Sequence, residues 1–357
     1  TDFVDGLNLC TSIEFGHGGV YVLQPPYLLF YPDEDQDDVP DADPKVLIAG
    51  FGMHDAQSLA NHLTWGPDGW LYGVQGSTVT SNIRGIEFQQ GVWRYHIQSD
   101  SFELYSEGGG NTFGLTFDEV GQLFQSTNGG PFLHVVPGAY FYKSFNKHGP
   151  LHNLFTYGYF SRVQRNHMAG GPPTGGTIYQ GNGFGREFNG RFIAGDFLGH
   201  NIFMWDVDAH GSTVRATDRG TFLRSNDSWF GPTDICIGPD GSLFVSDFHD
   251  QRTSHPDPDA KWDRSNGRIY RVSTGETGTP STPELSASST DLLFELAIGD
   301  DHWLREQARV MLHGRNATSL SDELAERSGR MLATSNTLGV LRTLWALNAV
   351  DRLKAND

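Results

Sequence analysis

The hydrophobic pattern changes once along the chain. Up to about residue 272, short apolar and aromatic runs alternate with clusters of Gly, Asn, Asp and Pro, which is typical of β-strands joined by tight turns. Beyond residue 290, Leu, Ala, Met and Trp recur every three or four residues, which predicts short amphipathic helices. The segment between them, residues 273–289, is rich in Ser, Thr, Gly and Pro, and we interpret it as a linker.

One phrase recurs through the strand-like part: a turn glycine followed by an aromatic and aliphatic strand. It occurs five times, with intervals of 50, 52, 69 and 51 residues between its glycines, which are Gly19, Gly69, Gly121, Gly190 and Gly241. A repeated unit of about 50 residues with four short strands describes a propeller blade. The alternative is a β-sandwich that reuses a turn, but sandwich strands lack such a period.

The predicted fold is therefore mainly β: a β-propeller over 1–272, a linker over 273–289 and a small α-helical, HEAT-like segment over 290–357. Five turn copies imply five blades. Because closed propellers of this blade type commonly have six, we expect an upstream blade in the full protein, although the 69-residue interval could instead hold an insertion. The helices form about two hairpins, and such stacks usually need three or more, so we expect the natural protein to continue.

Composition excludes several classes of function. The formal net charge is -18, with 43 acidic against 25 basic residues, which excludes a nucleic-acid-binding protein that neutralises phosphates with Lys and Arg. No apolar stretch approaches the roughly 20 residues that cross a bilayer. The two cysteines, Cys10 and Cys236, lie in apolar strand-like contexts and are expected to be buried free thiols rather than a disulfide.

Several long motifs carry a family resemblance. They are Gly50-Phe51-Gly52-Met53-His54-Asp55, Asn61-His62-Leu63-Thr64-Trp65-Gly66-Pro67-Asp68-Gly69, Gly91-Val92-Trp93-Arg94-Tyr95-His96, Lys147-His148-Gly149-Pro150-Leu151-His152 and His255-Pro256-Asp257-Pro258-Asp259. Through them, about residues 1–272 resemble the planctomycete-type membrane-bound dehydrogenase propeller family, which is related to soluble quinoprotein glucose and sorbosone dehydrogenases.

The resemblance implies a periplasmic or exported protein that oxidises a sugar or alcohol at the propeller channel. It also implies pyrroloquinoline quinone as cofactor and, in the full protein, a cytochrome c domain further downstream that receives the electrons. The helices after residue 290 are similar to the HEAT-like segment that follows the propeller in that family.

The catalytic position of the relatives is changed in this chain. Their catalytic histidine lies eight residues before the first glycine of Gly-Pro-Asp-Gly, where it takes a proton from the substrate hydroxyl. Here that position is Ser58, which lacks a near-neutral pKa, and His54 and His62 flank it. We predict that His54 or His62 acts as the catalytic base, with structural hydrogen bonding as the alternative role.

The cofactor position also departs from the family. Quinone-binding relatives carry Arg-x-Arg-Asp before the last Gly-Pro-Asp-Gly, and those arginines bind the carboxylates of the cofactor. This chain has Gly231-Pro232-Thr233-Asp234, so only Asp234 remains. Arg252 is a candidate replacement for the missing cations.

An acidic run places carboxylates at alternate positions, as calcium loops do. The candidate Ca²⁺ ligands are Asp33, Asp35, Asp37 and Asp41, although Asp38 occupies the position where such loops prefer Gly. A solvated acidic loop is the alternative. A further candidate site at the channel mouth consists of loop residues His148, His152, Asp196 and His249, whose alternative role is loop-ordering hydrogen bonds.

Two functions follow from these observations. The first is a quinoprotein-like sugar or alcohol dehydrogenase module. The second is a carbohydrate- or protein-binding propeller that has lost the redox chemistry, which Ser58 and the missing arginine pair favour.

Overall fold

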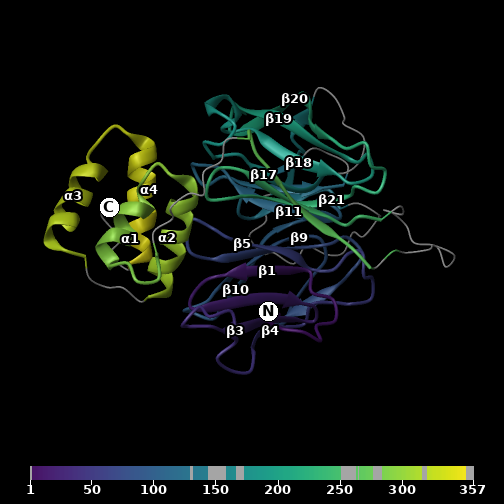
Figure 1. The fold of residues 1–357 in the computed structure, drawn as a ribbon, viewed down its shortest axis with the longest axis horizontal. Coiled ribbons are helices and arrows are strands. Elements are labelled where there is room, and N and C mark those ends of the chain that lie inside the picture. Colours follow the sequence, from purple (N-terminus) through teal and green to yellow (C-terminus); the bar gives the residue numbers. More distant parts are fainter. Residues whose placement is uncertain are drawn as a thin grey trace.

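The computed structural model describes residues 2–128, 132–143, 158–165, 173–250, 263, 265–275, 284–315 and 320–350. These residues form a mainly β region followed by four helices that lie at one end of it (Figure 1). His148, His152 and Arg252 lie outside the described residues. None of the described helices is long and apolar enough to cross a membrane.

Two of the β-sheets are built around four antiparallel strands. The first contains β1 (Ser12–Phe15), β2 (Gly19–Gln24), β3 (Tyr27–Pro32) and β4 (Lys45–Ala49). The second contains β5 (Asn61–Trp65), β6 (Leu71–Gln75), β9 (Gly91–His96) and β10 (Ser101–Glu107). The hairpin β7 (Ser81–Ile83) and β8 (Ile86–Phe88) lies between β6 and β9 in the sequence.

Three further sheets are built around three or four antiparallel strands that follow one another in sequence. The third contains β11 (Thr112–Phe117), β12 (Leu123–Thr127) and β13 (Leu133–Val135). The fourth contains β17 (Pro173–Ile178), β18 (Phe192–Asp196), β19 (Asn201–His210) and β20 (Thr213–Arg224), with the short helix η1 (Arg186–Phe188) before β18. The fifth contains β21 (Pro232–Ile237), β22 (Leu243–Asp247) and β23 (Arg268–Val272).

The long interval in the repeat contains additional strands. Between Gly121 and Gly190, β14 (Ala139–Phe141) and β15 (Gly158–Phe160) extend the second sheet, and β16 (Gln164–Arg165) pairs with β20 of the fourth. These strands pair in parallel with their neighbours, unlike the antiparallel strands around them. The extra residues therefore add to the sheets on either side.

Each repeated glycine turn connects the first and second strands of one sheet. Gly69, Gly121, Gly190 and Gly241 have φ between 75° and 82°, the left-handed region in which a side chain is strained. In the first copy the left-handed residue is Gly18 (φ 71°), one position before the predicted Gly19. Three turns also share one hydrogen-bond pattern: Gly69 N to Gly66 O, Gly121 N to Asp118 O and Gly241 N to Gly238 O.

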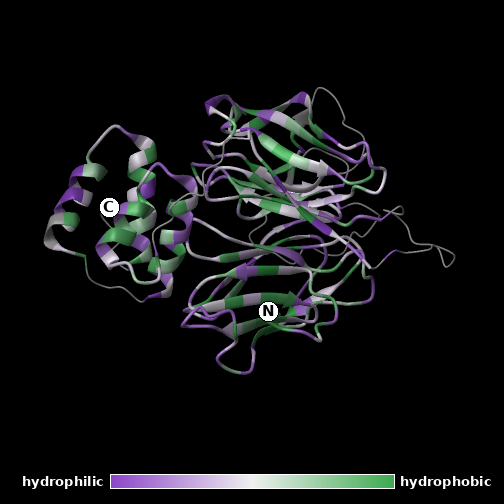
Figure 2. Ribbon diagram, viewed as in Figure 1, coloured by the Kyte–Doolittle hydropathy of each residue, from purple (hydrophilic) through white to green (hydrophobic). Residues whose placement is uncertain are grey.

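We call the first strand of each sheet its innermost strand: β1, β5, β11, β17 and β21. These five strands lie side by side in sequence order, with β5 between β1 and β11, and β17 between β11 and β21. Apolar side chains fill the space between sheets; one cluster joins Tyr21 and Leu23 of the first sheet to Leu63 and Trp93 of the second. Figure 2 shows hydrophobic stretches along the strands and more hydrophilic residues in the connecting loops. This arrangement is consistent with a β-propeller, and the number of blades stays a prediction.

The four helices are α1 (Thr290–Ala297), α2 (His302–Gly314), α3 (Asp322–Leu332) and α4 (Thr337–Ala349). Each begins at a capping residue that accepts a hydrogen bond from a backbone N–H in the first turn; these residues are Ser289, Asp301, Ser321 and Asn336. α1 packs against α2, and α3 against α4, around a separate apolar core that includes Phe294, Ala308, Leu312 and Ala346. Helical hairpins are thus present, and their assignment as HEAT repeats stays a prediction.

The helices contact the β region at its repeated turns. Val310 of α2 lies against Gly16, His313 of α2 against Gly69, and Trp345 of α4 against Gly121. A Cβ added at Gly16 or Gly121 would be only 2.8 Å from the facing side chain. Gln98 Nε2 also donates to His313 O at 2.8 Å. Gly69 and Gly121 of the repeat therefore serve both the turn and the close approach of the helices.

A comparison of Gly69 with Gly190 distinguishes the turn role from the docking role. Both glycines have φ 82°, but of the two only Gly69 faces a helix. We expect Gly190→Ala to lose about 1 kcal/mol through backbone strain alone. Gly69→Ala should lose more, because its Cβ must displace the buried His313 ring, and its melting temperature should be several degrees lower than that of Gly190→Ala. Thermal unfolding followed by circular dichroism measures both, and equal losses would contradict the role of Gly69 in docking.

Candidate functional site

A cavity lined by both polar and apolar side chains lies where the innermost strands converge. Its volume is about 500 Å³, and all five innermost strands line it, through Ser12 and Ile13, Asn61 and His62, Thr112 and Phe113, Thr174, and Thr233 and Asp234. Thr11, Ala56, Gln57, Leu59, Phe197 and Ser246 complete the lining. The cavity residues Asn61 and His62 lie at the start of β5. Trp65 ends this strand, and the turn that follows it contacts α2. The cavity is thus at the end of the innermost strands away from the helices.

Side chains around this cavity connect neighbouring sheets. Ser12 Oγ accepts from Leu63 N at 2.8 Å, Asn61 Nδ2 donates to Thr112 O at 3.2 Å, and Thr174 Oγ1 donates to Pro232 O at 2.5 Å. Thr112 Oγ1 donates to Gln75 O at 3.1 Å within the buried region. These bonds satisfy backbone groups that face another sheet, and they fix the positions of the cavity walls.

His62 and Asp234 meet in this cavity, although 172 residues separate them in the sequence. His62 Nδ1 is 3.7 Å from Asp234 Oδ2, and His62 Nε2 is 2.9 Å from Leu115 O, to which it donates. His62 has φ 52°, an uncommon conformation for a residue with a side chain. The neutral imidazole therefore presents the lone pair of Nδ1 near a carboxylate, an arrangement that can accept a proton.

His54, the other predicted base, lies outside the lining of the cavity. It is exposed, and its Nε2 is 3.0 Å from Thr78 O. Ser58, at the position of the relatives' histidine, is buried and 3.4 Å from Ser77 Oγ. Of the two predicted histidines, the geometry therefore favours His62.

Two ionisable side chains close to Asp234, Glu14 and Cys236, have raised pKa values. Burial raises the pKa of Glu14 on β1 to about 8; the Phe15 N–H bonded to its carboxylate opposes this rise, and the charge of Asp234 adds to it. Partial desolvation, then Asp234 and Glu14, raise the pKa of Cys236 to about 11. Both cysteines are free, as predicted, but both are solvent-exposed, which corrects the expectation of burial. Cys236 alternates with buried Ile235 on β21, so it faces away from the core.

Of the predicted channel-loop residues, Asp196 and His249 are described, and both are buried beside the cavity. Asp196 precedes the lining residue Phe197, and its carboxylate accepts from Gly199 N at 2.9 Å. Asp247, next to the lining residue Ser246, accepts from Gly231 N at 2.8 Å and from His249 Nδ1 at 3.2 Å. These bonds order the loops at this end of the strands, and neither Asp196 nor His249 lines the cavity.

The sequence analysis missed the hydroxyl and amide residues of the lining. Ser12, Asn61, Thr112 and Thr233 lie seven, eight, nine and eight residues before Gly19, Gly69, Gly121 and Gly241. Aligning the repeat copies on their turn glycines would have placed these polar residues at one end of four of the five innermost strands.

The described residues give a poor fit to pyrroloquinoline quinone. The cofactor carries three carboxylates, which require cations, yet the described cavity lining contains no Arg or Lys. The charge of Asp234 in the lining would repel it. Arg162 lies near this end of the strands, but its guanidinium group donates to the backbone oxygens Asn128 O and Gly109 O.

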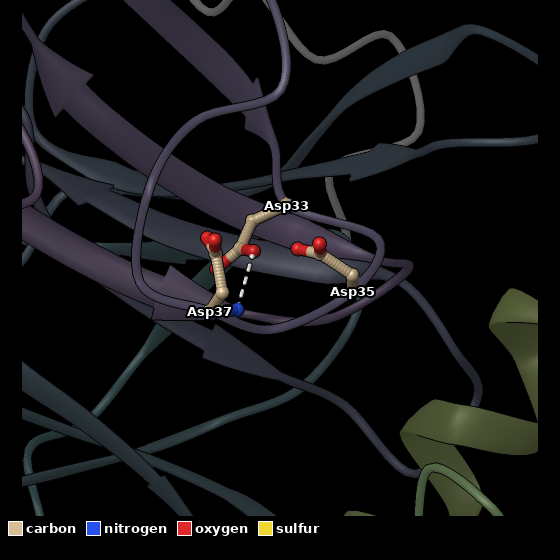
Figure 3. A group of neighbouring side chains, drawn as sticks. All are labelled: Asp33, Asp35 and Asp37. Atoms are coloured by element: carbon tan, nitrogen blue, oxygen red, sulfur yellow. Dashed lines mark hydrogen bonds between the residues drawn. The ribbon is translucent and has the colours of Figure 1, made fainter.

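Three of the four predicted calcium ligands converge, as Figure 3 shows for Asp33, Asp35 and Asp37. One carboxylate oxygen from each lies within 4.8 Å of the others, and Asp37 N donates to Asp33 Oδ1 at 3.2 Å. The fourth, Asp41, accepts from Glu34 N at 2.6 Å in the same loop. Asp38 adopts φ 64°, so it supplies the left-handed turn that calcium loops usually assign to Gly. The three carboxylates are close enough to share one metal ion, and Ca²⁺ as that ion stays a prediction.

A family model described as "Domain of unknown function (DUF7133)" matches residues 1–276. The chain belongs to this family. The DUF7133 match covers the β region, and the planctomycete-type resemblance stays a more specific prediction. No curated protein matches the sequence.

Solved structures similar to this DUF7133 chain include two sugar dehydrogenases. One is the form of aldose sugar dehydrogenase from Streptomyces coelicolor with bound pyrroloquinoline quinone (14% identity, TM-score 0.49, 75% of this chain and 82% of that one). The other is the soluble aldose sugar dehydrogenase from Escherichia coli in its apo form (12% identity, TM-score 0.41, 76% and 98%).

The raised pKa of Glu14 predicts a pH-dependent stability. Because its folded pKa, about 8, exceeds the ordinary value of 4.5, the folded state binds more protons between these values, and stability falls as pH rises through them. Glu14→Gln, which stays neutral, should therefore melt at a higher temperature than the wild type at pH 9 and at the same temperature at pH 4. The exposed Glu87→Gln is the matched control, and a pH-independent difference for Glu14→Gln would contradict this assignment.

Calcium is expected to stabilise the protein through Asp33, Asp35 and Asp37, because a ligand that binds only the folded state raises the melting temperature. Millimolar Ca²⁺ should raise it by several degrees relative to EDTA, and Asp35→Asn should remove most of that rise. Asp43→Asn, an exposed change in the same loop, should retain it. Identical melting in Ca²⁺ and EDTA would show a solvated acidic loop instead.

Proposed function

We propose that the cavity binds a neutral carbohydrate. One observation carries the proposal: side chains from all five innermost strands converge on one cavity, and most of the polar ones are uncharged hydroxyl or amide groups. Sugar hydroxyls both donate and accept hydrogen bonds, so they match Ser, Thr, Asn and Gln side chains, and a carboxylate such as Asp234 accepts from them.

The apolar part of the lining supports the same ligand class. Phe113 and Phe197 supply aromatic surface beside the polar groups, and aromatic rings pack on the C–H faces of sugars. Anionic ligands are disfavoured, since the described lining lacks Arg and Lys and includes Asp234. This is the binding-propeller hypothesis, and it requires no quinone.

A sugar or alcohol dehydrogenase is the second candidate, favoured by the His62 and Asp234 pair. In that function His62 Nδ1 would take the proton of a substrate hydroxyl, and the negative charge of Asp234 would stabilise the imidazolium that forms. Because the described residues do not fit the quinone, we derive no redox step. A periplasmic or exported location and a cytochrome c partner accompany this candidate as proposals.

The test is isothermal titration of the purified chain with a panel of neutral mono- and oligosaccharides. We expect binding by at least one sugar and a loss of affinity of about tenfold or more in Asp234→Asn, because a hydrogen bond to a charged acceptor contributes about 1.5–3 kcal/mol. His54→Gln, an exposed histidine outside the lining, should bind like the wild type. No binding across the panel would refute the carbohydrate proposal.

Pyrroloquinoline quinone binding and dye reduction over aldoses and alcohols, measured in parallel, separate the two candidates. The binding proposal expects neither. Quinone binding with turnover that is lost in His62→Gln but kept in His54→Gln would establish the dehydrogenase instead.

A further inference from the structure

Two histidines meet at the contact between the helices and the β region. His17 lies in the turn between β1 and β2, and its ring packs on Trp65 with 4.8 Å between ring centroids. His313 lies near the end of α2, is 7% exposed and faces Gly69. Gly314, the residue after His313, packs closely on His17, because a Cβ added to Gly314 would be 3.0 Å from His17 Cα. The two imidazoles thus come from opposite sides of one contact.

Neither imidazole has the hydrogen-bond partners that its protonated form requires. His17 Nδ1 is 3.1 Å from the Tyr21 hydroxyl, while the Nε2 atoms of His17 and His313 are both buried without a hydrogen-bond partner. A protonated imidazole needs a partner at both nitrogens, and burying a charged N–H without one is costly.

The surrounding charges oppose protonation further. From the β region, His96 of β9 acts electrostatically on His17 and on His313, and on α2 Arg309 acts on His313. The carboxylates in this region are already engaged: Asp68 accepts from Arg94 at 2.9 Å and from the Tyr72 hydroxyl at 2.8 Å, and Glu306 pairs with Arg309. Burial first, and then these neighbouring cations and histidines, lower the pKa of His17 to about 4 and that of His313 to about 3.

We propose that this contact is an acid-sensitive latch: the helical region stays docked on the β region while His17 and His313 are neutral, and protonation of these histidines releases it. The remaining contacts permit separation, since the helices have an apolar core of their own. Docking also depends on close approach at Gly16, Gly69 and Gly121, which a small displacement of α2 and α4 would end.

The direction of the effect follows from proton linkage. In the separated state both histidines take ordinary pKa values near 6.5, whereas in the docked state these values are lower. Between the two, the separated state binds more protons, so docking is complete above about pH 6.5 and weakens as pH falls. In that pH range, protonation of each histidine should reduce the equilibrium constant for docking about tenfold for every unit by which the pH falls.

The experiment is small-angle X-ray scattering of the full chain between pH 7.5 and 4, with circular dichroism on the same samples. We expect the radius of gyration to increase on acidification while the β and helical signals persist, and to return at pH 7.5. His17→Gln/His313→Gln should remain docked throughout, and each single variant should show a shallower transition than the wild type. The exposed His210→Gln should behave like the wild type.

Three results would overturn the latch. One is a wild-type radius that stays constant to pH 4, and another is an expansion that coincides with loss of the circular dichroism signal, which would be global unfolding. The third is a transition in both single variants whose midpoint and steepness equal those of the wild type. The single variants keep the test valid if the double variant does not fold.

Discussion

The left-handed glycine turn after each innermost strand is the constraint on which the rest of the structure depends. It leads the chain into the second strand of the same sheet, after a longer connection in the fourth unit, so every unit begins with the same pair of strands. Because Gly16, Gly69 and Gly121 have no side chain, the turns also present a surface that α2 and α4 can approach closely. One residue type therefore determines both the strand order within a sheet and the docking of the helices.

The opposite end of the same strands has a different character. There the polar residues Ser12, Asn61, Thr112, Thr174 and Thr233 gather because strands spaced far apart in the sequence begin at one place. Asp234 in the lining, with no described Arg or Lys beside it, makes this end suited to neutral ligands with hydroxyl groups. The helices occupy the other end, so binding and docking use separate surfaces of the β region.

Much of the architecture could be predicted from the sequence, because turns and periods are local signals. The five turn copies, the change to helices near residue 290 and the convergence of Asp33, Asp35 and Asp37 depend on residues close together in the chain. The pairing of His62 with Asp234 was not predicted, although each was a candidate, since it depends on how five strands are arranged in space. The same reason hid the exposure of Cys10 and Cys236 and the contact of His17 with the end of α2.

The bonds that cross between sheets have a consequence for how this family can diversify. Ser12, Asn61, Thr112 and Thr174 line the cavity and also hold a backbone group of an adjacent strand, so a change of ligand preference at these positions would loosen the framework. The aromatic rings of Phe113 and Phe197 have no hydrogen-bonding group and cannot take part in such bonds. Family members that bind different ligands should therefore differ first at these two aromatic positions. The hydroxyl and amide residues should stay constant, because they also hold neighbouring strands together.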